Sequence, residues 1–187
     1  MKRTLTLLLV VLTLGTTWAA DFPNRPSYTV HFSPKGGCTE AVVNALSQAR
    51  STVLVQAYSF TSAPIARALV DAHRRGVKVT VILDKSQRTE RYSSATFMAN
   101  YGIPTFIDDN HAIAHNKVMV IDSQTVLTGS FNFTKAAEEN NAENLLVIQD
   151  TQLAAKYTAN WKAHREHAEE YVSPGGGELP TTSRRRR

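Results

Sequence analysis

Cysteine is almost absent from this sequence, since Cys38 is the single one among 187 residues. One thiol cannot close a disulfide within the chain, so a packed core must supply the stability. A shielded thiol near the start of a helix is the favoured interpretation, and an intermolecular bridge stays open. Long apolar runs are scarce too. The run over residues 5–14 is shorter than the roughly 20 residues that span a membrane, and no later stretch approaches that length.

The N-terminal residues have the composition of an export signal. Lys2 and Arg3 precede the apolar run, and small residues follow it. Cleavage after Ala19 places Thr17 at the minus-three site, whereas cleavage one residue later places the bulky Trp18 there. We therefore predict a secretory signal peptide over residues 1–19 and a periplasmic or secreted protein. An uncleaved N-terminal anchor is the alternative.

The rest of the chain is predicted to form one domain over residues 20–172, followed by a flexible, glycine- and proline-containing tail over residues 173–187. Basic residues outnumber acidic ones by 21 to 16. Loss of the two basic residues of the signal peptide lowers the basic count to 19, and setting aside the four terminal arginines lowers it to 15. The folded body is thus nearly neutral, and any nucleic-acid groove must come from local clustering of charge.

Apolar and amphipathic segments alternate along this domain. Strands are predicted over residues 28–33, 52–58, 77–83, 104–107 and 143–148, and helices over residues 41–49, 65–75, 94–101, 134–140 and 153–171. Continuous apolar strands indicate a sheet covered on both faces, and the strand–helix–strand order indicates parallel crossovers. The predicted fold class is therefore α/β, with a mixed, largely parallel β-sheet flanked by helices on both faces.

A polar loop follows the third predicted strand, at the carboxyl end where ligands of open α/β sheets usually bind. Its basic residues Lys85, Arg88 and Arg91 are candidate contacts to nucleic-acid phosphates, which position a backbone and read no sequence. A solvated loop without a function is the alternative.

The segment 115–132 predicts a hairpin, because an apolar run, a polar turn and a β-prone run follow one another. With a loop of two residues, Lys117 faces Ser130 and His115 faces Asn132, so four polar side chains share one face. An imidazole attacks or transfers protons near neutral pH, and the other three groups donate hydrogen bonds to an anion. This set fits a phosphate ester, and a solvated surface face is the alternative.

The same register makes Ser123 and Gln124 the loop and pairs Asp122 with Thr125. Asp122 then points away from the polar face, so we predict a structural role in which it accepts backbone hydrogen bonds at the turn. Gly129 permits the backbone to turn or to approach a ligand closely.

The hairpin fills all six fixed positions of the pattern H-x-K-x4-D-x6-G-S-x-N. It resembles the phospholipase D superfamily in this motif, and the following F-N-F-T-K-A-A-E is similar to the single-motif bacterial endonuclease branch. The resemblance extends more weakly over residues 28–171. It implies a covalent mechanism in which His115 attacks phosphorus. Lys117 and Asn132 correspond to the phosphate clamp of the family. Ser130 corresponds to a supporting hydroxyl, and Glu143 to the carboxylate that orients the imidazole.

No other histidine of the chain is followed by x-K, whereas two-motif members of the superfamily carry two such histidines. One His115 cannot attack phosphorus and protonate the leaving oxygen at once. We therefore expect a twofold homodimer whose motifs meet at the axis.

A metal or other cofactor is not expected. The acidic residues and histidine over 108–111 match no magnesium or calcium loop spacing. His164 and His167 are expected to face the solvent rather than bind zinc, because no third ligand is evident.

These observations predict a secreted, metal-independent phosphodiesterase, in the first place a nonspecific endonuclease for DNA and RNA. A lipid-headgroup phospholipase of the same superfamily is one alternative. A non-catalytic nucleic-acid-binding protein is the other.

Overall fold

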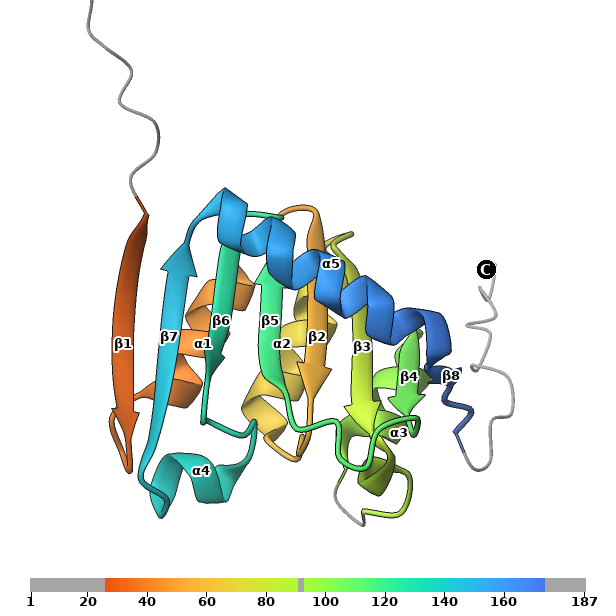
Figure 1. Cartoon of the computed structure of the whole chain (residues 1–187). Coiled ribbons are helices and arrows are strands. Elements are labelled where there is room, and N and C mark those ends of the chain that lie inside the picture. Colours follow the sequence, from red (N-terminus) through yellow and green to blue (C-terminus); the bar gives the residue numbers. More distant parts are fainter. Residues whose placement is uncertain (1–25, 91–92, 174–187) are drawn as a thin grey trace, which may run out of the picture.

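The computed structural model describes residues 26–90 and 93–173. In this part of the chain, eight strands form one sheet in the order β1-β7-β6-β5-β2-β3-β4-β8 (Figure 1). The strands are β1 Ser27–Ser33, β2 Thr52–Ala57, β3 Lys78–Asp84, β4 Thr105–Asp108, β5 Lys117–Ile121, β6 Thr125–Gly129, β7 Glu143–Gln149 and β8 Glu169–Glu170. The helices are α1 Cys38–Ser47, α2 Ala63–Arg74, α3 Ser94–Asn100, α4 Lys135–Glu139 and α5 Thr151–His167, with the short 3₁₀ helix η1 at Lys85–Arg88.

The predicted class, a mixed α/β sheet with helices on both faces, is confirmed. Helix α5 crosses one face of the sheet, and α1 and α2 cover the other (Figure 1). The expectation that parallel pairing dominates is wrong. Among the described strands only β2–β3 and β3–β4 pair in parallel, while the other five neighbouring pairs are antiparallel. The connection between β5 and β6 is too short for a crossover, so it permits only antiparallel neighbours.

The first strand takes an unexpected place in this sheet. β1 lies at one edge, antiparallel to β7, rather than beside β2. The pattern of the sequence predicts its existence and nearly its bounds, but not its partner, because pairing between segments more than a hundred residues apart has no local signal.

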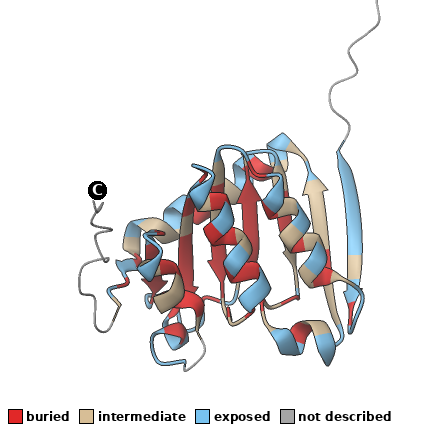
Figure 2. Ribbon diagram, turned by 180° about the vertical axis from the view of Figure 1, so that it is seen from behind, coloured by how far each residue is buried: buried red, intermediate tan, exposed pale blue. Residues whose placement is uncertain are grey.

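The main core lies between the sheet and the helices α1 and α2. Its largest buried side chains include Phe60, Phe131 and Phe133. Figure 2 shows buried residues concentrated in the central strands, while β1 is mostly exposed. On the other face, Trp161 of α5 is buried and donates a hydrogen bond from Nε1 to the Val55 carbonyl at 2.9 Å. Cys38 is a free, fully buried thiol at the first residue of α1, as predicted.

Helix α5 ends four residues earlier than predicted. It begins after Asp150, whose carboxylate accepts hydrogen bonds from the backbone of Gln152 and Leu153. Ala168 leaves the helix with an extended backbone, and the next two residues form β8 against β4. This tertiary pairing overrides the helical pattern of residues 168–171.

Three expectations lie outside the described residues: the signal peptide over residues 1–19, Arg91, and nearly all of the tail. Within the described residues, no helix has the length and apolar character that a membrane crossing requires.

Candidate active site

The motif residues gather at one end of the sheet, at the bottom in Figure 1, where β2, β3, β4 and β6 end and β5 and β7 begin. Lys117 is the first residue of β5, Gly129 the last of β6 and Glu143 the first of β7. His115 lies in the loop just before β5. The site thus lies at the carboxyl end of the parallel strands, where ligands of open α/β sheets bind.

His115 and Lys117 form the contact at the centre of this site. The Lys117 ammonium donates a hydrogen bond from Nζ to the carbonyl of His115 at 2.8 Å. It also lies over the ring of Tyr58, 5.1 Å from the ring centroid. The rings of Tyr58 and His115 pack at 4.5 Å between centroids, tilted by 52°. The tyrosine therefore contacts both motif residues and restricts the orientation of the imidazole.

Tyr58 is a site residue that the sequence analysis did not single out. It directly follows β2, and its backbone N–H donates to the Asn116 carbonyl at 2.8 Å, which holds it beside the motif. Its position in the sequence could have identified it, because Tyr58 follows a buried parallel strand and functional side chains of such sheets gather at the carboxyl ends of the strands.

Lys117 is a buried cation, with 7% of its surface exposed. Burial lowers the pKa of its ammonium, and the negative charge of Glu143 acts in the opposite direction. The hydrogen bond of Lys117 goes to a carbonyl rather than to a carboxylate, so its positive charge has no direct ion pair among the described residues. A buried ammonium of this kind is suited to binding an anion such as a phosphate group.

The predicted register of the hairpin is wrong by one residue. The structure pairs Ile121 with Thr125, and the turn spans residues 122–124. Asp122 and Ser123 adopt positive φ angles of 53° and 56°. Continuing the observed register places Lys117 opposite Gly129 rather than Ser130. The shared polar face was inferred from the predicted pairing, and a shift of one residue exchanges the faces of a strand.

Asp122 lies at the far end of β5 from Lys117, and its carboxylate joins the hairpin turn to the segment before β2. It accepts hydrogen bonds from the backbone of Arg50 at 2.9 Å, of Ser51 at 2.8 Å and of Thr52 at 2.9 Å. The Ser51 hydroxyl donates a fourth at 2.8 Å. Burial tends to raise the pKa of this carboxyl, but the four hydrogen bonds hold it below its usual range. Its partners thus lie outside its own turn.

Gly129 packs against the neighbouring strand so closely that a side chain has no room. A Cβ atom at this position would lie 2.3 Å from the carbonyl oxygen of Asn144. The next residue, Ser130, accepts hydrogen bonds at its Oγ from the backbone and the side-chain amide of Asn144, at 3.0 and 3.3 Å. These contacts fix the end of β6 on β7 and position the Ser130 hydroxyl.

The two other predicted site residues have less contact with the imidazole than expected. Glu143 accepts a hydrogen bond from the side chain of Asn141 at 3.1 Å, and none of the hydrogen bonds between described residues joins it to His115. Its charge nevertheless acts on Lys117. Asn132 has a buried Oδ1 without a hydrogen-bond partner among the residues described. A buried polar atom without a partner is uncommon and is often found at functional sites.

The basic residues of the polar loop make contacts within the protein. Lys85 donates to the carbonyl of His111 at 3.0 Å. Arg88 binds the carboxylate of Glu169 at 2.6 Å and lies 3.5 Å from that of Asp109. These contacts reduce the charge that the two residues present to a polyanion.

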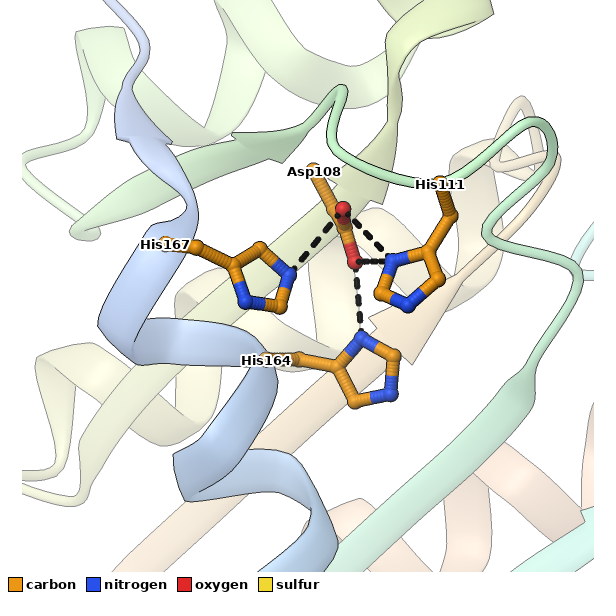
Figure 3. A group of neighbouring side chains, drawn as sticks. All are labelled: Asp108, His111, His164 and His167. Carbon is orange, nitrogen blue, oxygen red and sulfur yellow. Dashed lines mark hydrogen bonds and ion pairs between the residues drawn. The ribbon is translucent and has the colours of Figure 1, made fainter.

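A second group of polar side chains, the Asp108 cluster, consists of Asp108, His111, His164 and His167 (Figure 3). Three imidazoles converge on the buried carboxylate of Asp108 at the end of β4. His164 Nδ1 lies 2.7 Å from Oδ2, His111 Nδ1 lies 3.0 and 3.1 Å from the two oxygens, and His167 Nε2 lies 3.2 Å from Oδ1. Burial tends to raise the pKa of Asp108, but hydrogen bonds from His164 and His111 lower it to about 2.

The expectation that His164 and His167 face the solvent is wrong, because both turn toward Asp108 (Figure 3). The sequence held a partial signal. Asp108 and His111 are three residues apart, and so are His164 and His167. Their meeting depends on the path of α5 across the sheet to β4, which no local pattern specifies.

Comparison with known proteins identifies the family. A family model described as cardiolipin synthase, PLD-like domain, matches residues 42–165. The chain is a member of the phospholipase D superfamily. Its relatives include the phospholipase D of Rickettsia conorii, 41% identical over 138 residues, which are 74% of this chain and 69% of that protein. The mitochondrial cardiolipin hydrolase of Mus musculus is 33% identical over 111 residues, 59% of this chain and 50% of the relative.

Solved structures show the same superfamily fold. Nuc from Salmonella typhimurium, a phospholipase D family member, matches with a TM-score of 0.77 and 41% identity, over 80% of this chain and 100% of that one. NucT from Helicobacter pylori matches with a TM-score of 0.73 and 27% identity, over 79% of this chain and 100% of that one. As a phospholipase D superfamily member, the protein is a phosphodiester hydrolase.

Proposed function

We propose that this phospholipase D superfamily hydrolase is a nonspecific endonuclease that cleaves DNA, with RNA as a second substrate, and that it needs no catalytic metal. The observation that carries the proposal is the contact between His115 and the buried Lys117 on a fold that matches Nuc along the whole of that chain. The similarity to NucT supports the same assignment.

The mechanism follows from the chemistry of these groups. The His115 imidazole attacks phosphorus, a P–N bond forms, and the bond from phosphorus to the leaving oxygen breaks. A second imidazole gives that oxygen its proton. Water then attacks the phosphohistidine, loses a proton to the second imidazole and releases the phosphate monoester. Lys117 and Asn132 stabilise the charge on the phosphoryl oxygens, with the Ser130 hydroxyl close by.

We also propose that the second imidazole is His115 of a second copy of the chain, in a twofold homodimer. The chain holds one copy of the motif. A surface that fits such a contact lies on the edge strand β1 of the same sheet, where Tyr28, Val30 and Phe32 are 71%, 45% and 63% exposed on one face. On the neighbouring β7 their cross-strand partners include the half-buried Ile148 and Leu146. Helix α5 leaves these two strands uncovered (Figure 1).

Chain mixing tests the homodimer. If one active site needs both imidazoles, an equal mixture of wild type and His115→Ala should have about a quarter of the activity of the same total amount of wild type. Independent subunits should give about half. Heterodimer formation must be checked separately, for example with chains of different mass.

Substitution on β1 tests the surface. Phe32→Glu should place a charge in the contact, shift the protein to a monomer in sedimentation, and reduce cleavage strongly. Val172→Glu is the matched control, because Val172 is 78% exposed near the opposite edge of the sheet. A Phe32→Glu protein that remains a fully active dimer contradicts the proposed surface.

Plasmid cleavage in excess EDTA tests the reaction. It is measured at a temperature well below the Tm of the protein in EDTA. Nicking should persist in EDTA and disappear in His115→Ala. Intact plasmid together with the release of headgroups from phospholipid vesicles favours the alternative lipid activity. The names of the Rickettsia and mouse relatives support that second candidate. Plasmid binding without cleavage by the wild type favours a non-catalytic nucleic-acid-binding protein.

Export is part of the same proposal. A basic N-terminus, an apolar run and small residues before a cleavage site after Ala19 support a periplasmic or secreted enzyme. N-terminal sequencing of the protein purified from its native host should begin at Ala20, and a chain that begins at Met1 contradicts export by cleavage.

A further inference from the structure

The Asp108 cluster joins two parts of the chain that are distant in sequence. Asp108 ends β4 and His111 lies in the following loop, whereas the other two histidines lie in the last turn of α5. One donor atom from each of the four residues can be chosen so that all four lie within 4.8 Å of one another. Neutral imidazoles and a carboxylate are ligands that Zn²⁺ takes in proteins.

The distances fit one tetrahedral ion. Four ligand atoms at about 2.0–2.1 Å from Zn²⁺ lie about 3.3 Å from one another at the corners of a tetrahedron. The nitrogens lie 2.7–3.2 Å from one or the other oxygen of Asp108, slightly closer than this edge, and the four chosen ligand atoms lie within 4.8 Å of one another. Side-chain rotations that move the nitrogens slightly away from the carboxylate and closer to one another complete the coordination.

The charge of the cluster also fits a cation. The Asp108 side chain is fully buried, and a buried carboxylate needs a compensating positive charge. Arg88, which lies 3.5 Å from the neighbouring Asp109, binds Glu169 instead. Three protonated histidines would overcompensate the carboxylate, with their ring centroids only 4.8–5.6 Å apart. One divalent ion with neutral imidazoles provides the compensation without this repulsion.

A hydrogen-bonded cluster with one protonated histidine is the competing arrangement, and the geometry of two rings speaks against it. Such a cluster needs each ring to direct an N–H at an oxygen. His167 Nε2 is buried 3.2 Å from Oδ1, yet it makes no hydrogen bond of acceptable geometry. His111 Nδ1 lies at nearly equal distances from both carboxylate oxygens, 3.0 and 3.1 Å, instead of pointing at one of them. We infer that one Zn²⁺ ion binds to the four residues of the Asp108 cluster.

The role of this ion is structural. Four protein ligands close a tetrahedral site, whereas a catalytic zinc keeps a position for water or substrate. The loop that holds His111 continues to His115 four residues later. Lys85 and Asp84 also hold this loop, through the His111 carbonyl and the Ala114 N–H. The ion therefore holds the loop that leads from His111 to the catalytic His115 against the end of α5.

Metal analysis of the full chain, purified without a polyhistidine tag, tests this inference. After zinc addition and gel filtration, about one zinc per chain is expected. Co²⁺ in its place should show the visible absorption of tetrahedral cobalt. Free zinc at a hundred times its Kd should raise the Tm by about 5–11 °C, and EDTA should reverse the rise. Plasmid nicking below the Tm of the metal-free protein should persist, because the ion takes no part in the chemistry.

Three variants locate the ion. The double variant His164→Ala/His167→Ala should lose both the bound zinc and the Tm rise. His115→Ala should keep both, which separates this site from the catalytic histidine. His31→Ala is the matched control, since His31 lies on β1 at the opposite edge of the sheet. A zinc-treated wild type without bound zinc overturns the inference, as does a double variant that binds zinc and gains Tm like the wild type.

Discussion

Replacement of Gly129 by alanine should destabilise the contact between β6 and β7, on which the positions of Ser130 and Glu143 depend. The new Cβ would lie 2.3 Å from the Asn144 carbonyl oxygen, whereas ordinary contacts begin near 3.4 Å, so the strands must separate by about 1 Å. Such overpacking costs about 1–3 kcal/mol. The φ angle of +149° adds strain, about 1–3 kcal/mol for a residue with a side chain.

Together these two effects predict a loss of about 2–6 kcal/mol in the free energy of unfolding. For a domain of this size the Tm should fall by roughly 4–24 °C. Urea denaturation measures the first quantity and calorimetry the second. Plasmid nicking should also fall when it is measured well below the Tm of the variant, because the end of β6 holds Ser130.

Gly76→Ala is the control for this substitution. Gly76 also has a positive φ, +93°, but a Cβ there meets nothing within 4 Å. Its cost should be limited to the backbone strain of about 1–2 kcal/mol, with normal nicking. If Gly129→Ala is no less stable than Gly76→Ala, the close approach of β6 to β7 leaves room for a side chain at position 129, and the predicted clash is refuted.

Three further predictions concern single titratable groups. Asp122→Asn should cost about 2–3 kcal/mol of stability at pH 7, because a charged acceptor of four hydrogen bonds is lost. The folded pKa of Asp122 is lowered, so this difference should be complete above about pH 5 and shrink as the pH falls through the folded pKa. Equal differences at pH 7 and pH 2 in urea titrations contradict it. Glu143→Gln should lower the pKa of Lys117 and move the alkaline limb of kcat/KM to lower pH; an unmoved limb shows that the two charges do not interact. Burial raises the pKa of Cys38 to about 11, so thiol reagents at pH 8 should label it only after unfolding, and rapid labelling of the native protein excludes the buried position.

The elements of the fold could be predicted from the sequence because local patterns carry them. Apolar runs such as β2 and β3 act within a few residues. The motif spacing likewise identified His115 and Lys117, since H-x-K holds its two side chains in one short segment.

The hairpin register and the contacts of Glu143 could not be predicted in this way. The turn of the hairpin depends on Asp122, whose partners are backbone groups about 70 residues away. Tyr58 was overlooked for a similar reason, because it meets His115 only through the pairing of β2 with β5.

The amino-acid order by itself determined which segments are strands and helices and which short motif carries the chemistry, because these depend on interactions between near neighbours. Tertiary structure alone decided the place of β1 at the edge, the exposed apolar face of that strand, and the convergence of three histidines on Asp108. Each of these requires segments far apart in the chain to pack together, and the free energy of that packing comes from the whole sheet rather than from any one segment.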